Sequence, residues 1–209
     1  MVIITVVIAV FLLLVCNELW WRHHNSHSEL SRKFIHITVG SFVAFWPFFL
    51  SWNQIRWLSL AFLIVVAISR YFQIFRAIHS VTRPTWGEVY FAVAVGAVTF
   101  ITNNKWVYVA ALLQMSLADG LAAIIGVRYG PTNRYHVLGQ AKSVVGTLTF
   151  IIVSMVILAV FSHNNIYAIT GMAIFGLATL AGVLENLGVF GLDNLLVPIF
   201  IATLLGIIA

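Results

Sequence analysis

Charged residues are scarce in this sequence: Asp, Glu, Lys and Arg together make up 8% of its 209 residues, and only six of them are acidic. A soluble domain carries charge on about a quarter of its residues, so this composition excludes an ordinary water-soluble protein. The single cysteine, Cys16, excludes an internal disulfide, and Leu14 and Val15 before it lack the small residue expected ahead of a lipidated cysteine. A membrane protein without disulfides is therefore expected.

Hydrophobic residues make up 62% of the chain, and apolar runs of about 15 to 20 residues recur along its whole length. Each run is about as long as a helix needs to cross the hydrocarbon of a bilayer. We therefore expect an all-α, polytopic integral membrane protein that forms a single domain over residues 1–209. About eight spans are expected: 2–20, 34–50, 57–75, 88–102, 106–127, 143–161, 166–184 and 195–209.

The basic residues predict how these spans are oriented. Nine of the eleven lie in or near the links after the first, third and fifth expected spans, with Arg70 in the last turns of the third span, and only Arg56 and Lys105 lie on the other side. By the positive-inside rule the basic side faces the cytoplasm, which places both termini on the non-cytoplasmic side. This orientation explains the net charge of +5, so we expect membrane lipids as partners and no nucleic acid.

Asp119 lies inside an apolar segment, about eight residues or 12 Å from its expected cytoplasmic end. A carboxylate buried in a membrane costs at least a few kcal/mol, so it indicates a function and a positively charged partner. We expect Lys142 to be that partner. A stripe of small residues follows on the same helix face, which close helix packing alone would explain: Ala122, Ala123, Gly126 and Gly130.

Lys142 and Ser143 are expected to begin the sixth span, followed by Gly146 and Thr147. A helix N-terminus offers unpaired N–H groups and a partial positive charge, and a lysine there adds a full one, which together favour a phosphate. The alternative is an interfacial lysine that only sets the topology. The segment lacks the spacing of a Walker A loop.

Further polar residues lie near the same face of the membrane. Arg32, Lys33 and His36 fall within about one helical turn and would bind an anion or meet anionic lipid. Glu88 begins the fourth span, either as an ordinary helix-start carboxylate or as a functional one. Metal binding, lipid-headgroup contact and a solvated loop are all compatible with the polar residues of the last link: Glu185, Asn186, Asp193 and Asn194.

Five segments resemble, in order, the CTP-dependent lipid kinases that comprise dolichol kinase, phytol kinase and the yeast-type diacylglycerol kinase: 29–36, 87–88, 119–130, 142–150 and 184–198. The specific part is the set Asp119, Ala122, Gly126 and Gly130, followed closely by Lys142, Ser143, Gly146 and Thr147. Two positions depart from the family. Ala118 stands where members often have glycine, and Val145 where dolichol kinases often have glutamate, which weakens an assignment to dolichol.

The resemblance implies an EC 2.7.1-type phosphotransferase that uses Mg²⁺ and moves the γ-phosphoryl group of a nucleotide, typically CTP, to the hydroxyl of a membrane lipid alcohol. Such a reaction needs cations around the phosphates and a carboxylate that holds the metal or accepts the proton. On this basis Asp119, Glu88 and His36 are assigned as catalytic, with Asp119 and Glu88 as metal ligands. Glu185, Asp193 and Asn194 are assigned to substrate binding or structure. The nucleotide-binding residues are then Arg32, Lys33, Gly126, Gly130, Lys142, Ser143, Gly146 and Thr147.

The expected acceptor is an isoprenoid alcohol such as phytol, farnesol, geranylgeraniol or polyprenol. The expected site is the cytoplasmic face of a bacterial or archaeal cell membrane, or of an organelle membrane. A CTP-dependent diacylglycerol kinase and a CTP:lipid-phosphate cytidylyltransferase are the enzyme alternatives. The cytidylyltransferase's characteristic serine, Gly-Asp and terminal Lys-Arg arrangement is not found in the sequence. A small cation-coupled transporter is the other alternative, although the polar residues gather at one membrane face. The sequence indicates no oligomeric state.

Overall fold

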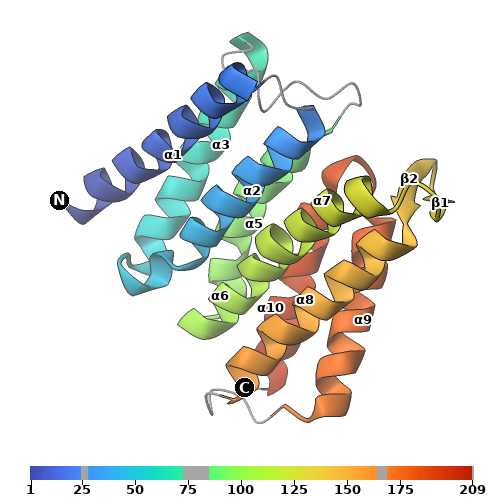
Figure 1. The fold of residues 1–209 in the computed structure, drawn as a ribbon. Helices are drawn as coiled ribbons and strands as arrows, with labels where there is room; N and C mark the ends of the chain where they lie inside the picture. The colour runs from blue at the N-terminus through green and yellow to red at the C-terminus, as the bar shows by residue number, and fades with distance from the viewer. Residues whose placement is uncertain (25–27, 73–84, 164–168, 209) are drawn as a thin grey trace.

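The computed structural model describes residues 1–24, 28–72, 85–163 and 169–208 (Figure 1). Arg76 and Arg83, two of the basic link residues, lie outside these ranges. The helical elements are α1 (Val2–His24), α2 (Ser28–Ala44), the 3-10 turn η1 (Trp46–Phe48), α3 (Trp52–Phe72), α5 (Gly87–Ile101), α6 (Lys105–Leu113), the π-helical turn η2 (Gln114–Ala118), α7 (Asp119–Tyr129), α8 (Val144–His163), α9 (Gly171–Leu187), the 3-10 turn η3 (Val189–Gly191) and α10 (Asp193–Ile208). The predicted all-α class is confirmed, apart from one small hairpin of β1 (Arg134–Val137) and β2 (Gln140–Ser143).

Four helical segments in the described part of the chain are long and apolar enough to cross a membrane: Val2–Trp20, Trp52–Ser69, Lys105–Tyr129 and Val144–Ser162. The third of them joins α6, η2 and α7 into one continuous rod. Helices α5, α9 and α10 are apolar but shorter. These lengths are consistent with the membrane protein that the composition predicts.

Several helix boundaries differ from those expected, and two of the differences have a clear local cause. Helix α2 ends at Ala44, well before residue 50, because Pro47 cannot donate a helix hydrogen bond and disfavours helical geometry in the residue before it. Helix α3 begins at Trp52 and not at residue 57. Ser51 caps it: the Ser51 N–H donates to Gln54 Oε1 at 2.8 Å, and the Gln54 N–H donates to Ser51 Oγ at 3.4 Å. This reciprocal capping box is a start signal that the hydrophobic pattern alone does not reveal.

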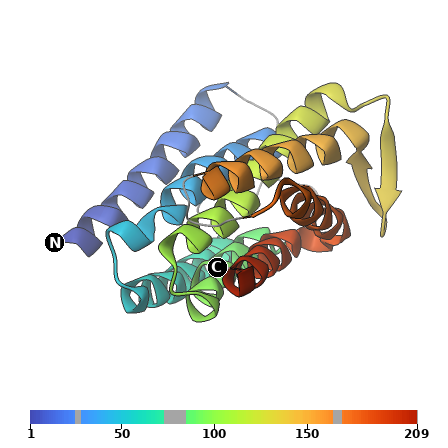
Figure 2. The same ribbon diagram turned by 90° about the horizontal axis from the view of Figure 1, so that it is seen from below.

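The rod formed by α6, η2 and α7 is the core of the bundle. Helix α6 contacts α2, α8 and α10, and its residues 107–112 have no exposed surface. Helix α7 packs on α8, which packs on α9, while α10 lies between α9 and α5. Helix α1 packs on α2 and lies at the edge of the bundle (Figure 2). The central rod therefore carries Asp119 into the interior of the protein.

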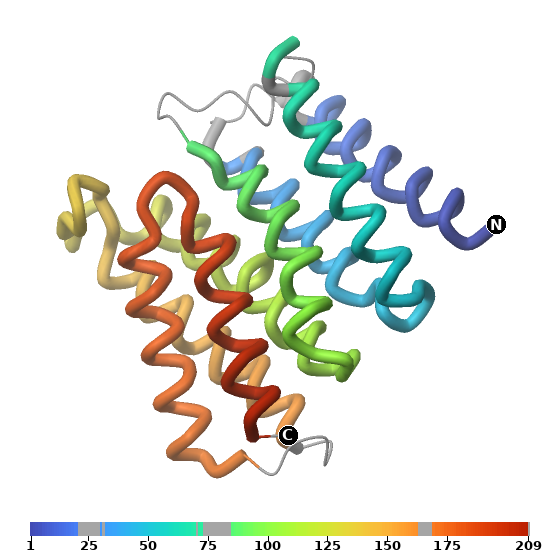
Figure 3. Tube along the Cα trace, turned by 180° about the vertical axis from the view of Figure 1, so that it is seen from behind, coloured from blue at the N-terminus to red at the C-terminus, as the bar shows by residue number. Residues whose placement is uncertain are grey.

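The polar links gather at one end of the bundle. The hairpin, the turn between α9 and α10, and the first turns of α2 and α5 all lie at this end (Figures 1 and 3). Both chain termini lie at the opposite end, with the turns between α2 and α3 and between α5 and α6 (Figure 3). The fold thus separates a polar end from an end that carries both termini.

Asp193 follows a tight turn that ends α9. Phe190 and Gly191 have positive φ angles of 56° and 88°. The turn is anchored on the start of α5, because the Trp86 N–H donates to the Phe190 carbonyl at 2.9 Å. A Cβ atom at Gly191 would lie 2.6 Å from Gly87 Cα, closer than atoms can approach. The turn therefore fixes where Asp193 begins α10.

Replacing Gly191 with alanine is expected to destabilise the protein, since it combines a positive φ angle with a clash against Gly87. Gly176→Ala is the matched control, because a Cβ atom there meets nothing within 4 Å. Thermal unfolding in detergent should show a lower midpoint for Gly191→Ala and an unchanged or higher one for Gly176→Ala. Equal midpoints for the two variants would contradict this account of the turn.

Candidate functional site

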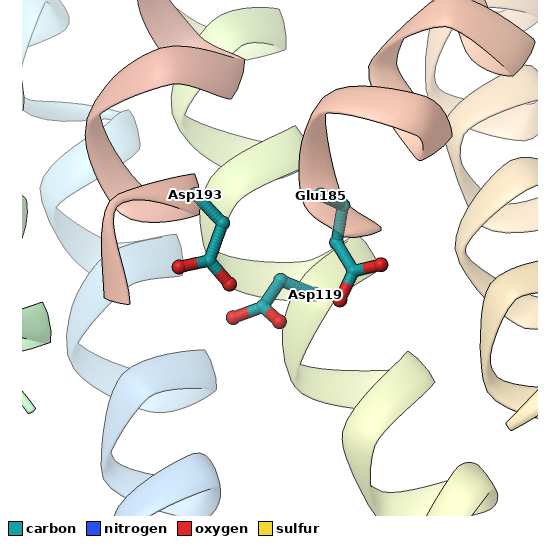
Figure 4. Close-up of side chains that lie close together, drawn as sticks. All are labelled: Asp119, Glu185 and Asp193. Carbon is teal, nitrogen blue, oxygen red and sulfur yellow. The ribbon is translucent and has the colours of Figure 1, made fainter. Parts of the chain in front are cut away.

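Three buried carboxylates from distant parts of the chain meet at the polar end of the bundle (Figure 4). Asp119 begins α7, Glu185 lies in the last turn of α9, and Asp193 begins α10. One oxygen atom from each lies within 4.8 Å of the others, and the residues are 4%, 7% and 8% exposed. Carboxylates this close repel each other strongly when they are shielded from water. The site therefore needs positive charge nearby.

The π-helical turn η2 sets the position of Asp119. A π-turn places one extra residue in a helix, and such turns are frequent at functional sites. The Ser116 hydroxyl donates to the Leu112 carbonyl at 2.8 Å, and Gln114 Nε2 donates to the Ser154 carbonyl of α8 at 3.3 Å. These bonds hold the turn in the core, directly before the aspartate.

Two lysines from different elements pair with the carboxylates. Lys33 Nζ of α2 lies 2.6 Å from Asp119 Oδ2, and Lys142 Nζ lies 2.5 Å from Glu185 Oε1. Lys142 also donates to the Glu185 carbonyl at 3.0 Å. The expectation that Lys142 pairs directly with Asp119 is therefore wrong. His36 completes the surroundings of Asp119, with Nε2 at 3.6 Å from Oδ2 and 2.9 Å from the carbonyl of Met115.

The charge of Lys142 depends on these carboxylates. Its burial would lower the pKa of the ammonium group, but Glu185 and Asp193 outweigh that effect and raise the pKa above its usual value. Lys142 therefore remains positively charged near neutral pH.

The hairpin explains why Lys142 has a different partner from the one expected. Lys142 and Ser143 do not begin a helix: they end β2, and Tyr135 of β1 lies opposite Lys142 in the antiparallel register. Leu138 and Gly139 form the turn with positive φ angles of 48° and 81°, as a two-residue hairpin turn requires. The hairpin thereby brings Lys142 over the end of α9, next to Glu185.

Side chains of the hairpin and its neighbours tie this region together. The Ser143 hydroxyl accepts a hydrogen bond from the Gly146 N–H at 3.1 Å, so it caps α8. The Tyr135 hydroxyl donates to Asn186 Oδ1 at 2.6 Å and also contacts the Thr147 hydroxyl. The hairpin is therefore fixed to both α8 and α9.

The carboxylates border a cavity of about 380 Å³. Most of the residues predicted for the site line it: Arg32, Lys33, Asp119, Gly126, Lys142, Ser143, Gly146, Thr147, Glu185, Asp193 and Asn194. Three predicted residues are not among its lining. Glu88 and His36 line a second, smaller cavity nearby, and Gly130 packs against Ser143. Glu88, predicted as a metal ligand with Asp119, is also not part of the carboxylate cluster.

Close packing accounts for the glycines of α7 and α8. A Cβ atom at Gly126 would lie 2.8 Å from Ser143 Oγ and 3.2 Å from Gly146 Cα. A Cβ atom at Gly130 would lie 2.5 Å from the Ser143 side chain. These glycines let α7 lie close to Ser143 and to the start of α8, which is the packing explanation of the small-residue stripe.

Sequence reasoning missed several residues that line the cavity or hold its walls: Thr85, Arg134, Tyr135, Gln140 and Phe190. The signal that would have found most of them is the hairpin. Residues 134–143 contain two short strands around a Leu-Gly turn, and Gly after an expected helix end favours a turn over a continued loop. Phe190 has no comparable signal, because its place depends on the turn between α9 and α10.

Comparison with known proteins finds no matching family model and no similar solved structure. The chain is similar to phytol kinase from Synechocystis sp., with 32% identity over 190 residues, which cover 87% of this chain and 80% of that protein. It is also similar to dolichol kinase from Saccharomyces cerevisiae, with 39% identity over 93 residues, or 43% of this chain and 17% of that protein.

Replacing Lys142 with methionine leaves Glu185 buried without its compensating charge, which costs about 3–5 kcal/mol. We expect Lys142→Met to lower the thermal unfolding midpoint in detergent, and Lys142→Met/Glu185→Met to recover much of the loss. A double variant no more stable than Lys142→Met would show that the pair does not depend on charge compensation.

Proposed function

Because the chain belongs to the lipid-kinase family that includes phytol kinase and dolichol kinase, we propose that it transfers the γ-phosphoryl group of CTP to the hydroxyl of an isoprenoid alcohol. The observation that carries this proposal is the cluster of Asp119, Glu185 and Asp193 beside two lysines in one cavity. Phosphoryl transfer needs this combination of metal-binding carboxylates and phosphate-binding cations.

Mg²⁺ would be held by Asp119, Glu185 and Asp193, since carboxylate oxygens are the protein ligands that Mg²⁺ prefers. Their fit is supported by Asp193 Oδ1, which is buried and has no hydrogen-bond partner among the described residues. This set replaces the pair of Asp119 and Glu88 predicted from the sequence. Bound Mg²⁺ supplies positive charge that offsets the phosphates and the charge developing during transfer.

The nucleotide phosphates would lie in the larger cavity, whose volume of about 380 Å³ is within the usual range for a small-molecule site. Lys142 and Arg32 border it and would bind phosphate oxygens. Gly146 and Thr147 at the start of α8 also line the cavity. Arg134 and Gln140 of the hairpin also line the cavity and would meet the rest of the nucleotide.

The reaction itself is a displacement at phosphorus. The hydroxyl oxygen of the alcohol bonds to the γ-phosphorus, the bond to the β–γ bridging oxygen breaks, and CDP leaves. Asp119 takes up the hydroxyl proton. Because His36 Nε2 lies 2.9 Å from a carbonyl oxygen, this nitrogen acts as a donor. The His36 nitrogen nearest Asp119 is therefore not available to accept the hydroxyl proton, which leaves this role to Asp119 in the scheme.

In the bilayer, all eight expected segments would cross, with the polar end of the bundle in the cytoplasm and both termini outside. The chain has eleven basic residues, and nine of them lie on the side expected to face the cytoplasm, which supports this orientation. The shared position of the hairpin and the first turns of α2 and α5 also supports it (Figure 1). A lipid hydroxyl at the interface and a nucleotide from the cytosol would then meet at Asp119.

The test uses purified protein with Mg²⁺, CTP or ATP labelled at the α or the γ phosphorus, and a panel of phytol, farnesol, geranylgeraniol, polyprenol and diacylglycerol. Label that reaches an isoprenoid alcohol only from the γ position of CTP supports the proposal. Label from the α position identifies a cytidylyltransferase, and transfer to diacylglycerol alone identifies a diacylglycerol kinase. If no label is transferred, and liposomes that contain the protein but no nucleotide take up solute, the protein is a transporter.

Asp119→Asn should lower kcat by at least about 100-fold, because the amide neither takes up a proton nor neutralises a metal. The variant leaves Lys33 without its counter-charge and should unfold at a lower temperature, but the amide oxygen can still accept a hydrogen bond from Lys33, so the protein should fold in detergent. Phosphoryl transfer and the elution profile in detergent check both points. A folded Asp119→Asn variant with activity within tenfold of the native protein would refute the assignment.

Asp193→Asn should raise the Mg²⁺ concentration that gives half-maximal activity by about tenfold or more, because it removes one anionic ligand. Glu88→Gln serves as the matched control and should leave this concentration unchanged, since Glu88 is not in the carboxylate cluster. The Mg²⁺ dependence of the initial rate measures both. The opposite pattern would restore Glu88 as a metal ligand.

A further inference from the structure

A second cavity, of about 70 Å³, lies beside the larger one. Arg32, Lys33 and Asn194 line both cavities, so the two cavities adjoin at these side chains. Beyond them the second cavity is lined mainly by apolar side chains of α1, α2, α3 and α5: Leu14, Ile35, Val39, Phe62, Val66 and Phe91. The larger cavity has a mixed, charged lining, whereas this one is apolar with a polar end.

The polar end of the second cavity adjoins the carboxylate cluster. His36 lines this cavity, and its Nε2 atom lies 3.6 Å from Asp119 Oδ2. Lys33 also lines it and forms the ion pair with Asp119 at 2.6 Å. The Phe91 ring packs against both His36 and Phe62, with centroids 5.3 and 6.0 Å apart, which continues the apolar wall away from the charges. A ligand here would have its polar end toward Asp119.

The size of the cavity limits what it can hold. A volume of about 70 Å³ is several times what a water molecule requires. It accommodates a short stretch of carbon chain and not a whole lipid. Helices α1 and α3 border the cavity and also present apolar residues outward, such as Phe11 and Ile64. The remainder of a long chain would therefore find apolar surroundings beyond these helices.

We propose that this second cavity binds the hydroxyl end and the first carbon atoms of the acceptor lipid alcohol. Its apolar wall receives the chain, and its polar end directs the hydroxyl toward Asp119. The two cavities adjoin at Arg32, Lys33 and Asn194, so the hydroxyl group and the γ-phosphate would meet beside these side chains. This inference rests on the proposed lipid-kinase function for the identity of the ligand.

The test is photolabelling with a farnesol analogue that carries a diazirine next to the hydroxyl carbon, followed by mass spectrometry of the labelled peptides. Label is expected on Val39, Phe62 or Val66, and unmodified farnesol should compete for it. Label confined to outward-facing residues such as Ile64, or not reduced by farnesol, would reflect ordinary contact with bilayer lipid and would overturn the inference.

A matched pair of variants on α3 sharpens this test. Val66 lines the cavity and is 6% exposed, whereas Ile64 faces outward and is 53% exposed. Val66→Phe should reduce labelling of the cavity and raise the KM for farnesol by about tenfold or more, with the KM for CTP unchanged. Ile64→Phe should change neither. Equal behaviour of the two folded variants would contradict the proposal.

The labelling requires no nucleotide, so it separates this inference from the proposed function. Label in the cavity of a protein that transfers no phosphoryl group would refute the kinase function and retain the alcohol site. Phosphoryl transfer by a protein labelled only elsewhere would retain the kinase function and refute the site.

Discussion

The ion pair between Lys33 and Asp119, at 2.6 Å, joins α2 to the central rod of the bundle. Both groups are nearly buried, and each would be costly in an apolar interior without the other. The carboxylate remains negative in the core because this lysine lies next to it. The position of α2 against α6 and α7 is thus linked to the charge of the one aspartate inside the rod.

The other elements at the polar end also place positive charge beside buried carboxylates. Asp119 is joined by Glu185 and Asp193, and a second lysine reaches this cluster only because the hairpin carries it there. The glycines between α7 and α8 permit the close approach, and the turn of positive φ angles before α10 fixes Asp193. Three carboxylates with two paired lysines leave one negative charge among these five groups, which suits the binding of a divalent cation.

Much of the fold follows from the sequence because apolar runs of membrane length have few alternatives to helices. Asp119 could be singled out as a candidate from the same apolar run, because a carboxylate is costly there and needs a positively charged partner. Its partner could not be identified, because Lys33 lies 86 positions away in sequence and only tertiary packing brings it near. The sequence instead suggested Lys142, which is closer along the chain but belongs to a strand.

The cluster with Glu185 and Asp193 was likewise beyond sequence reasoning, although both residues were noted as candidates. Their approach depends on the positive φ angles of Phe190 and Gly191, and one of these residues is not a glycine. Glu88 resembled them in the sequence, as an acidic residue at a helix start, but α5 places it beside the smaller cavity. Acidic residues near one membrane face can be listed from sequence, but their grouping follows from turns and helix contacts.

The proposed reaction depends on Asp119, Glu185 and Asp193 holding one divalent cation together. The most direct measurement is an experimental structure of the protein with Mn²⁺ in place of Mg²⁺ and a non-hydrolysable CTP analogue, with the metal located by its anomalous scattering. One anomalous peak is expected within coordination distance of these three carboxylates. A peak at Glu88 and away from the cluster, or a nucleotide bound with no metal at the three carboxylates, would contradict it.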